Sequence, residues 1–435
     1  MHFTIALFAL LCAYVAADPS PGCSISAGAG EVKAGERIYD FDGRELRVHL
    51  PTTYDGRTPT GVIIALHDRG ETGETMGIGT GFHDEDKNAG WVVVYPNAKE
   101  GYWTSDPMAD YEPDHTRDNR SDIVRTAALL DHLGTKYCID TRRVHVAGLG
   151  TGGGMTHLFA CSPVLSTRIA SVAIVGGLFF EAKPGDESVS GRAWARCRPG
   201  RRPVPLLEMH GNADVVAPYW PPEGAGDERT VKVVEWIEGW RGRNGCGEVV
   251  GGPQKSEYSD ATYETEMIGG WVSEGVVFGG GAVRVAHACV GSGKEEVRGK
   301  VDLREERWLT NLHYSLRGVG HVWPRGAELQ KDEVVVINKI SVTPPGLPFF
   351  HATKEALKWF EAHELPEAGE LKKQMAELKE ERAKEEKKSG KKEEKKAKKE
   401  DGKIEKKKQA EKDVEIDEAE AEGKAEEAVH RKDEL

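Results

Sequence analysis

Short apolar runs recur along the first 365 residues and alternate with segments of helical periodicity. Continuous apolar runs of this length predict strands buried on both faces, as in a parallel sheet that is covered by helices. They lie at residues 61–67, 91–96, 143–148, 169–177, 204–211 and 312–321, and the clearest helical patterns lie at residues 122–135 and 231–240. The glycine-rich segment 264–301 predicts a β-rich insertion. The alternation predicts an α/β fold with a mostly parallel, doubly wound sheet, whose sites lie at the carboxyl ends of the strands.

Three of these predicted strands are followed by residues that indicate chemistry. The sequence GLGTG, residues 148–152, has the strand–turn–helix context of a nucleophile elbow, G-x-S-x-G, but carries Gly150 in place of the serine. Asp214 follows the run 204–211, and His321 ends the run 312–321. Each residue alone is an ordinary loop residue, whereas an elbow, an acid and a histidine in this order match the chain order of an α/β-hydrolase triad.

Longer motifs carry a family resemblance over residues 21–364. They are IIALHDRGETG, VVVYPNA, YCIDTRRVHVAGLGTGGGMTHLFAC, PVPLLEMHGNADVVAPY, WRGRNGC and HYSLRGVGHVWP. In these segments the chain resembles the fungal feruloyl esterases, which are related to acetyl xylan esterases and polyhydroxybutyrate depolymerases. The resemblance implies an α/β-hydrolase fold and hydrolysis of hydroxycinnamoyl or acetyl esters of plant cell-wall polysaccharide. It also implies that Asp214 is the triad acid and His321 the base.

Two positions depart from the family pattern. Gly150 replaces the serine nucleophile, and Asp68 replaces a glycine in the loop whose amides, near Arg69, form the oxyanion hole together with the Thr151 amide. A carboxylate at position 68 opposes the developing negative charge if it faces the site. The family's glycine at this position also predicts a backbone conformation that favours glycine. Loss of a triad nucleophile lowers turnover by about a million-fold.

The sequence therefore predicts an esterase homologue without serine chemistry, which binds a feruloylated or acetylated polysaccharide or a glycan. One alternative is an active feruloyl or acetyl xylan esterase that uses water or another nucleophile. A second alternative is an interaction scaffold in the endoplasmic reticulum. Trp103 and Trp323 either line an aromatic acyl pocket or pack in the core. No cofactor or metal is predicted, because the sequence contains no phosphate-binding loop, dinucleotide fingerprint or metal-ligand cluster.

The amino-terminal segment 1–17 has the apolar run and the small final residues of a signal peptide, with a membrane anchor as the alternative. No later run reaches the about 20 apolar residues of a membrane span. The even number of cysteines left after residue 17 predicts disulfides, with 15 possible pairings. These cysteines are Cys23, Cys138, Cys161, Cys197, Cys246 and Cys289. A Cys246–Cys289 pair is favoured because both lie in one irregular segment. Asn119 begins a glycosylation sequon.

From residue 366 the composition changes abruptly to Glu, Lys and Ala, which predicts a charged, flexible, low-complexity tail over 366–435 after a hydrolase domain over 18–365. Its opposite charges nearly balance, so most of the net charge of −13 belongs to the folded part, which argues against nucleic acid as a partner. The chain ends in a return signal for the endoplasmic reticulum. This signal is Lys432, Asp433, Glu434 and Leu435. It predicts the KDEL receptor as a partner and an ER-lumenal location, with secretion as the alternative.

Overall fold

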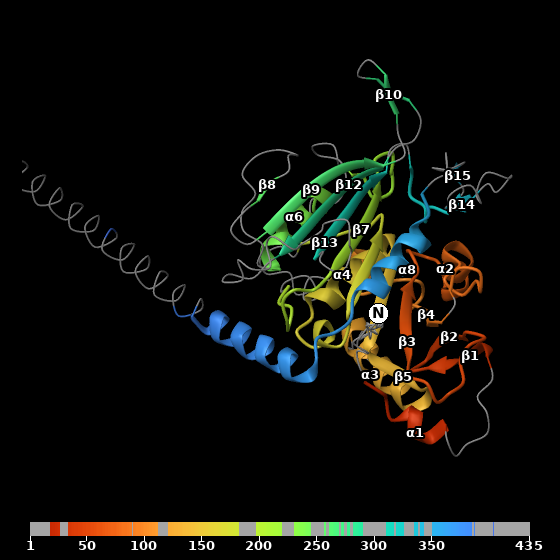
Figure 1. The fold of residues 1–435 in the computed structure, drawn as a ribbon. Coiled ribbons are helices and arrows are strands. Elements are labelled where there is room, and N and C mark those ends of the chain that lie inside the picture. The colour runs from red at the N-terminus through yellow and green to blue at the C-terminus, as the bar shows by residue number, and fades with distance from the viewer. Residues whose placement is uncertain are drawn as a thin grey trace, which may run out of the picture. The chain divides into compact units, whose positions relative to one another are not determined.

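The computed structural model describes most of the predicted hydrolase region. The described residues are 18–26, 34–88, 90–111, 121–181, 197–219, 230–244, 256–257, 261–268, 271–273, 276–278, 282–289, 310–316, 319–325, 335–337, 340–342, 350–384, 387 and 403. The chain divides into two compact units, Met1–Lys372 and Lys373–Leu435. The candidate site lies in the first unit, which is shown in Figure 1.

The first unit is built on a sheet of eleven described strands in the order β1-β2-β4-β3-β5-β6-β7-β13-β12-β9-β8. The strands are β1 (Gly35–Phe41), β2 (Arg44–Leu50), β3 (Thr60–Leu66), β4 (Val92–Pro96), β5 (Ile139–Leu149), β6 (Ser171–Val175), β7 (Leu206–Gly211), β8 (Ser256–Glu257), β9 (Ala261–Ile268), β12 (Ala282–Cys289) and β13 (Asn311–Leu316). The six strands from β4 to β13 are parallel to their neighbours. Antiparallel strands extend both edges. This arrangement confirms the predicted α/β fold.

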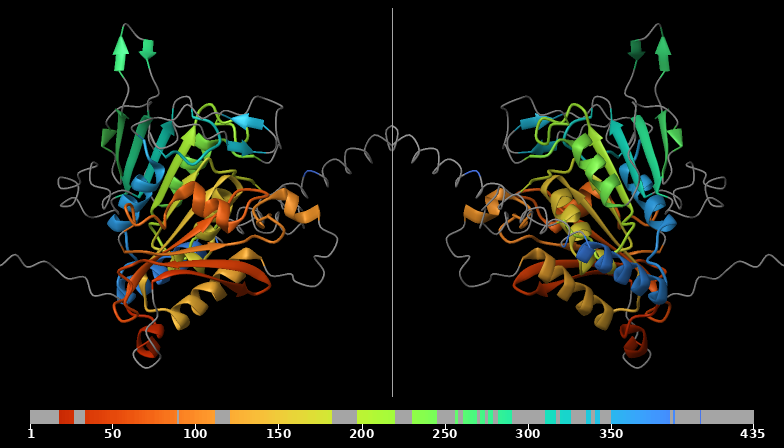
Figure 2. Two further views of the ribbon diagram at one scale, coloured as in Figure 1. Left: turned by 90° about the vertical axis from the view of Figure 1, so that its right-hand side faces the viewer. Right: turned by 90° about the vertical axis from the view of Figure 1, so that its left-hand side faces the viewer.

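All six predicted apolar strands are present, and they are the six parallel strands β3, β4, β5, β6, β7 and β13. The segment predicted as a β-rich insertion contains β9, β12 and the hairpin of β10 (Trp271–Ser273) and β11 (Val276–Phe278). Pairing of β12 with β13 continues the main sheet. A small separate sheet consists of β14 (Val335–Ile337) and β15 (Ile340–Val342). Figure 1 labels most of these strands, and Figure 2 shows the sheet from two further sides.

Helices cover both faces of the sheet, as continuous apolar strands require. The described helices of the first unit are α1 (Gly22–Ser26), α2 (Gly73–Thr80), α3 (Asp122–Lys136), α4 (Gly150–Cys161), α6 (Val233–Arg243) and α8 (Ala352–Ala362), with short 3₁₀ helices η1 (Pro107–Tyr111) and η2 (Leu165–Thr167). Within β3, Ile64 faces a core shared with α3, α4 and α6. Its neighbour Ile63 faces a second core shared with α2 and α8. The two-residue period of a strand therefore divides the apolar residues between two layers.

Two disulfides join segments of the described chain: Cys23–Cys138, with a sequence separation of 115 residues, and Cys161–Cys197, with a separation of 36. These bonds confirm that disulfides form. The first ties the amino-terminal segment to the start of β5, and the second closes the end of α4. The favoured Cys246–Cys289 pair lies outside the described residues, because Cys246 is not described and only the backbone of Cys289 is.

A helix over residues 368–384 begins close to the predicted start of the tail. Before it, the Arg142 guanidinium donates to the Leu365 carbonyl at 3.0 Å and to Glu367 Oε1 at 2.6 Å. Within this helix, Leu378 is buried and Met375 is exposed. Flexibility of the tail beyond this helix stays a prediction.

We expect removal of the Cys23–Cys138 bond, by the double change to alanine, to destabilise the fold by about 1 kcal/mol more than removal of Cys161–Cys197. The reason is that the longer closed loop restricts the unfolded chain more strongly. Urea unfolding of the two double variants under oxidising conditions measures the difference. Equal or reversed losses would show that native-state packing at these bonds outweighs loop entropy.

Candidate functional site

Four parallel strands end at one edge of the sheet, and the loops that follow them form the candidate site. Asp68 follows β3, Gly150 follows β5, Asp214 follows β7 and His321 follows β13. The carboxyl ends of parallel strands meet at the same edge, so residues 253 positions apart in the sequence come into contact. The structure thus brings together the three predicted triad positions and, with them, Asp68.

The turn between β5 and α4 has the geometry of a nucleophile elbow. Gly150 has a φ of +55°, a left-handed conformation that costs an L-residue with a side chain about 1–2 kcal/mol. Gly152, in the first turn of α4, passes so close to β3 that an added Cβ would lie 2.4 Å from the carbonyl oxygens of Leu66 and His67. The backbone therefore keeps the bend that presents a nucleophile, while the residue at its apex has no side chain.

The Asp68 carboxylate occupies the space of the missing serine side chain. A Cβ built on Gly150 would lie 2.1 Å from Asp68 Oδ1, 2.3 Å from Cγ and 2.7 Å from Oδ2. The carboxylate at position 68 therefore faces the site, which is the condition under which it opposes a developing negative charge. Asp68 is not among the described non-glycine residues with positive φ, which are Asp42 and Glu100. The expectation that position 68 demands a glycine-type backbone is therefore wrong, since an aspartate adopts the turn without entering that region.

One oxygen of this carboxylate lies where an oxyanion is expected. The Thr151 backbone N–H donates to Asp68 Oδ1 at 2.7 Å, and the Thr151 hydroxyl donates to the same oxygen at 3.1 Å. The backbone N–H of Arg69 also contributes to lowering the pKa of Asp68. Both predicted oxyanion-hole amides therefore interact with a permanent negative charge of the protein itself.

The other oxygen pairs with the candidate base. His321 Nε2 lies 3.0 Å from Asp68 Oδ2, and His321 Nδ1 lies 2.7 Å from Asp214 Oδ2. Burial lowers the pKa of His321, but hydrogen bonds and charges from Asp214 and Asp68 outweigh it and raise the pKa to about 10. Burial conversely raises the pKa of Asp68, and the His321 partner lowers it to about 2. At neutral pH an imidazolium therefore donates to two carboxylates.

Neighbouring loops hold Asp68 and the elbow in place. His67 Nε2 accepts from the Ala98 backbone N–H at 3.0 Å, so its Nδ1–H is free to donate to the Asp68 carbonyl at 2.7 Å. The Arg69 guanidinium makes a two-pronged ion pair with Asp106, at 2.5 and 2.8 Å. Ser105 Oγ donates to the Thr151 carbonyl at 2.8 Å. The loop after β4 thus links the oxyanion loop to the start of α4.

The two predicted aromatic site residues are buried. Trp103 is 2% exposed and donates its indole N–H to the His67 carbonyl at 2.8 Å. Trp323 is 4% exposed and donates to Thr353 Oγ1 at 2.9 Å. Both indoles therefore have the packing role that the sequence also allows, and their contact with a ligand stays a prediction.

Sequence reasoning missed two acidic groups beside the site. Burial raises the pKa of Glu71, and the Asp68 charge adds to the shift. Glu208 is 1% exposed in β7 and accepts from His210 Nδ1 at 2.9 Å and from His313 Nδ1 at 2.5 Å. His210 Nε2 in turn lies 3.7 Å from Asp214 Oδ2. A charged residue inside the apolar run LLEMHG is the sequence signal for this buried network.

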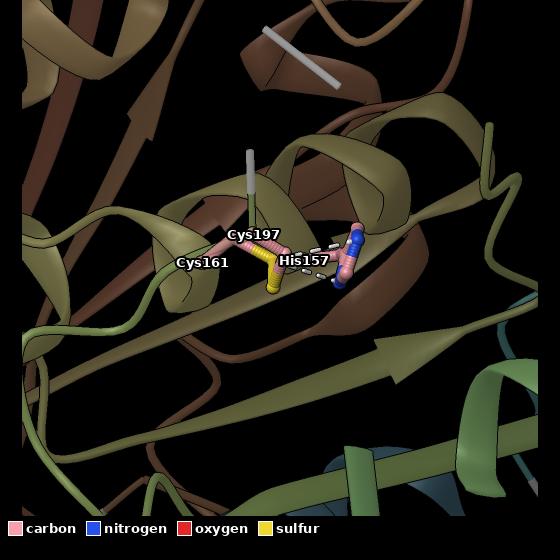
Figure 3. Close-up of side chains that lie close together, drawn as sticks. All are labelled: His157, Cys161 and Cys197. Carbon is pink, nitrogen blue, oxygen red and sulfur yellow. Dashed lines mark hydrogen bonds between the residues drawn. A yellow bond between two sulfur atoms is a disulfide. The ribbon is translucent and has the colours of Figure 1, made fainter. Parts of the chain in front are cut away.

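Among the described residues, one group of potential metal ligands lies within 4.8 Å: His157, Cys161 and Cys197. Figure 3 shows His157 facing the Cys161–Cys197 disulfide. The oxidised sulfurs lack the thiolate charge that zinc requires. His157 Nδ1 also accepts indole N–H groups from Trp236 and Trp240, at 3.1 and 3.0 Å. This cluster therefore serves packing rather than metal binding.

Several predicted features lie outside the described residues. They are the signal peptide, the Asn119 sequon and the carboxyl-terminal residues Lys432, Asp433, Glu434 and Leu435. Within the described part, no helix has the length and apolar character that crossing a membrane requires.

Comparisons with known proteins find similarity to feruloyl esterases. No protein-family model matches the chain. The probable feruloyl esterase C of Aspergillus niger is 25% identical over 251 residues, which are 57% of this chain and 76% of that protein. Feruloyl esterase D of Neurospora crassa is 28% identical over 223 residues, 49% of this chain and 68% of that protein. Over these segments the chain is similar to feruloyl esterases. This similarity and the parallel sheet identify an α/β-hydrolase fold.

Among solved structures, an acetyl xylan esterase from Aspergillus awamori aligns with a TM-score of 0.44 and 15% identity, over 75% of this chain and 99% of its own.

Replacing Asp68 by asparagine should lower the pKa of His321 by about 1–3, because one of its two anionic partners is lost. Imidazole resonances followed by NMR over pH 5–11 measure this change, with Asp55→Asn as a control on an exposed loop. In the wild type, the raised pKa stabilises the fold fully below about pH 6.5, and this contribution is lost as the pH rises through about 10. An unchanged pKa in Asp68→Asn would contradict the observed ion pair.

A serine introduced at Gly150 should destabilise the fold by more than the left-handed backbone alone explains. Gly43 supplies the matched control, because it has a φ of +78° and nothing within 4 Å of an added Cβ. Gly43→Ser therefore carries the backbone strain of about 1–2 kcal/mol, whereas Gly150→Ser adds the contact with Asp68. Urea unfolding compares the two variants, and the addition of Asp68→Gly should relieve the excess at Gly150. Equal losses at both glycines would mean that Asp68 moves away without cost.

Proposed function

We propose that this esterase relative has lost serine ester hydrolysis and binds a feruloylated or acetylated polysaccharide, or a glycan, without cleaving it. The observation that carries this proposal is the position of the Asp68 carboxylate. Its oxygens lie within 2.7 Å of the space of a serine Cβ at position 150, and one of them accepts from the Thr151 amide. An ester carbonyl needs that amide to bear its developing charge.

The protonation state of His321 argues against water activation by the same residue. A general base must hold an unprotonated nitrogen near the proton that it removes. Both ring nitrogens of His321 face carboxylates, and its pKa is raised to about 10. At neutral pH the fraction of neutral imidazole is therefore about one in a thousand. An active esterase by a water route is the alternative, and it requires Asp68 to leave His321.

The carboxylates around His321 favour an uncharged ligand over an acidic one. Asp68 and Asp214 place two carboxylates around one imidazolium, and Glu71 lies close enough to respond to the Asp68 charge. A neutral ester or sugar avoids the repulsion that a free acid meets at this edge. We therefore infer that intact esters bind in preference to free hydroxycinnamic acids. Retention in the lumen of the endoplasmic reticulum, through the KDEL receptor, belongs to the same proposal.

The wild type should neither hydrolyse methyl ferulate nor be labelled by a fluorophosphonate. Calorimetry should detect binding of methyl ferulate or a feruloylated oligosaccharide, and weaker binding of free ferulate. The double variant Gly150→Ser with Asp68→Gly restores the nucleophile and frees both amides, so its turnover should exceed that of either single variant by orders of magnitude.

Two results would contradict the proposal. Wild-type turnover that is abolished by His321→Ala in a folded protein would establish an active esterase. The absence of binding heat at millimolar ligand, in a folded protein, would favour the scaffold alternative.

A further inference from the structure

The Asp68 carboxylate has the surroundings of a nucleophile as well as those of an obstruction. It is ionised at neutral pH, since its pKa is about 2, and it lies at the elbow where a nucleophile belongs. Its Oδ1 is held by the Thr151 amide and hydroxyl. Its Oδ2 faces His321, which Asp214 holds from the other side. A carboxylate can act as a covalent nucleophile when a neighbouring base activates the water that later hydrolyses the intermediate.

The contacts of the two oxygens restrict the electrophile. Attack on an acyl carbon puts negative charge on the substrate's carbonyl oxygen, and the amides that stabilise such a charge are occupied by Oδ1. Displacement at a saturated carbon puts the charge on the leaving group instead. That group departs in line, on the side opposite Oδ2, where His321 cannot reach it with a proton. The geometry therefore selects a leaving group that is stable as an unprotonated anion, such as a halide.

We propose that Asp68 is a catalytic nucleophile for hydrolytic displacement at primary alkyl carbons that carry a halide-type leaving group. A lone pair of Oδ2 forms the new C–O bond, and the electron pair of the carbon–halogen bond leaves with the halide. Asp68 becomes a neutral alkyl ester whose carbonyl oxygen, Oδ1, still faces the Thr151 amide. This inference rests on one part of the proposed function, the loss of serine ester hydrolysis.

The second half-reaction uses the remaining triad residues in their ordinary roles. Esterification removes one of the two negative charges beside His321, so His321 releases its proton to solvent. The neutral imidazole then takes a proton from a water molecule, which attacks Cγ of Asp68 while the Thr151 amide stabilises the charge on Oδ1. Collapse expels the alkoxide from Oδ2, which receives a proton from His321. The new carboxylic acid returns its own proton to His321, so the net change is alkyl halide plus water to alcohol, halide and one proton.

The loop after β7 offers surface suited to such substrates. Val215 and Val216 follow Asp214 directly and are 80% and 47% exposed. An alkyl chain can bury apolar surface against these two exposed side chains.

The test uses the full-length protein and 1-bromobutane as the probe. Wild-type protein should release bromide, and Asp68→Asn should reduce that release by at least about 1,000-fold. In a single turnover in H₂¹⁸O, the heavy oxygen should enter the Asp68 carboxylate rather than the butanol, because water attacks Cγ. His321→Gln should retain a butyl group on Asp68, located by peptide mass spectrometry. Asp55→Asn is the control that should match the wild type.

The outcomes separate this inference from the proposed function. The inference would be overturned if the wild type released bromide no faster than Asp68→Asn, or if the heavy oxygen appeared only in the butanol. The isotope measurement uses the wild type alone, so it does not depend on the folding of a variant. Hydrolysis of methyl ferulate, or fluorophosphonate labelling, would overturn the proposed function instead, whatever the bromide result.

Discussion

The bridge that the Asp68 carboxylate makes between the Thr151 amide and His321 is the interaction on which the rest of the site depends. It fills a space that exists only because Gly150 has no side chain. Without the carboxylate, the Thr151 amide would be a buried donor without its partner, and such a group destabilises a fold by about 1–3 kcal/mol. Without the glycine, the carboxylate would overlap a side chain. The glycine at position 150 and the aspartate at position 68 are therefore sterically complementary.

This coupling reverses the electrostatics of an esterase site. In a serine esterase, the amides at the elbow remain available for a charge that develops during the reaction. Here the charge is permanent, and it holds the imidazole in its protonated form. Asp68 Oδ1 already accepts from the Thr151 amide and hydroxyl. These donors are therefore occupied and oppose acyl transfer to a serine, whereas the same contacts suit the proposed carboxylate nucleophile. The proposed binding role and the proposed displacement chemistry are two consequences of one arrangement.

Rigid surroundings make the arrangement specific. Asp68 lies two residues after β3, an interior strand of the sheet. Its carbonyl accepts from His67, whose orientation is set by the Ala98 amide. Asp214 Oδ1 accepts from the backbone N–H groups of Val216 and Ala217 at 2.8 and 2.7 Å, which leaves Oδ2 for His321. Buried side chains with satisfied hydrogen bonds have little conformational freedom, so folding sets the positions of these site atoms.

The sequence by itself determined the parallel sheet, the glycine at the elbow and the order of Asp214 and His321, because strand burial and strand-end position are properties of local pattern. It indicated disulfides, but not the Cys23–Cys138 and Cys161–Cys197 pairs, since spacing carries no information on which loops meet. Only the tertiary structure decided that Asp68 points into the elbow, that Glu208 joins His210 and His313 in a buried network, and that the charge of Asp68 acts on Glu71. The direction of a side chain after a strand depends on how closely α4 packs against β3. The hydrogen bond from the Thr151 amide to Asp68, formed where the two elements meet, joins residues 83 positions apart, a separation that no local sequence pattern covers.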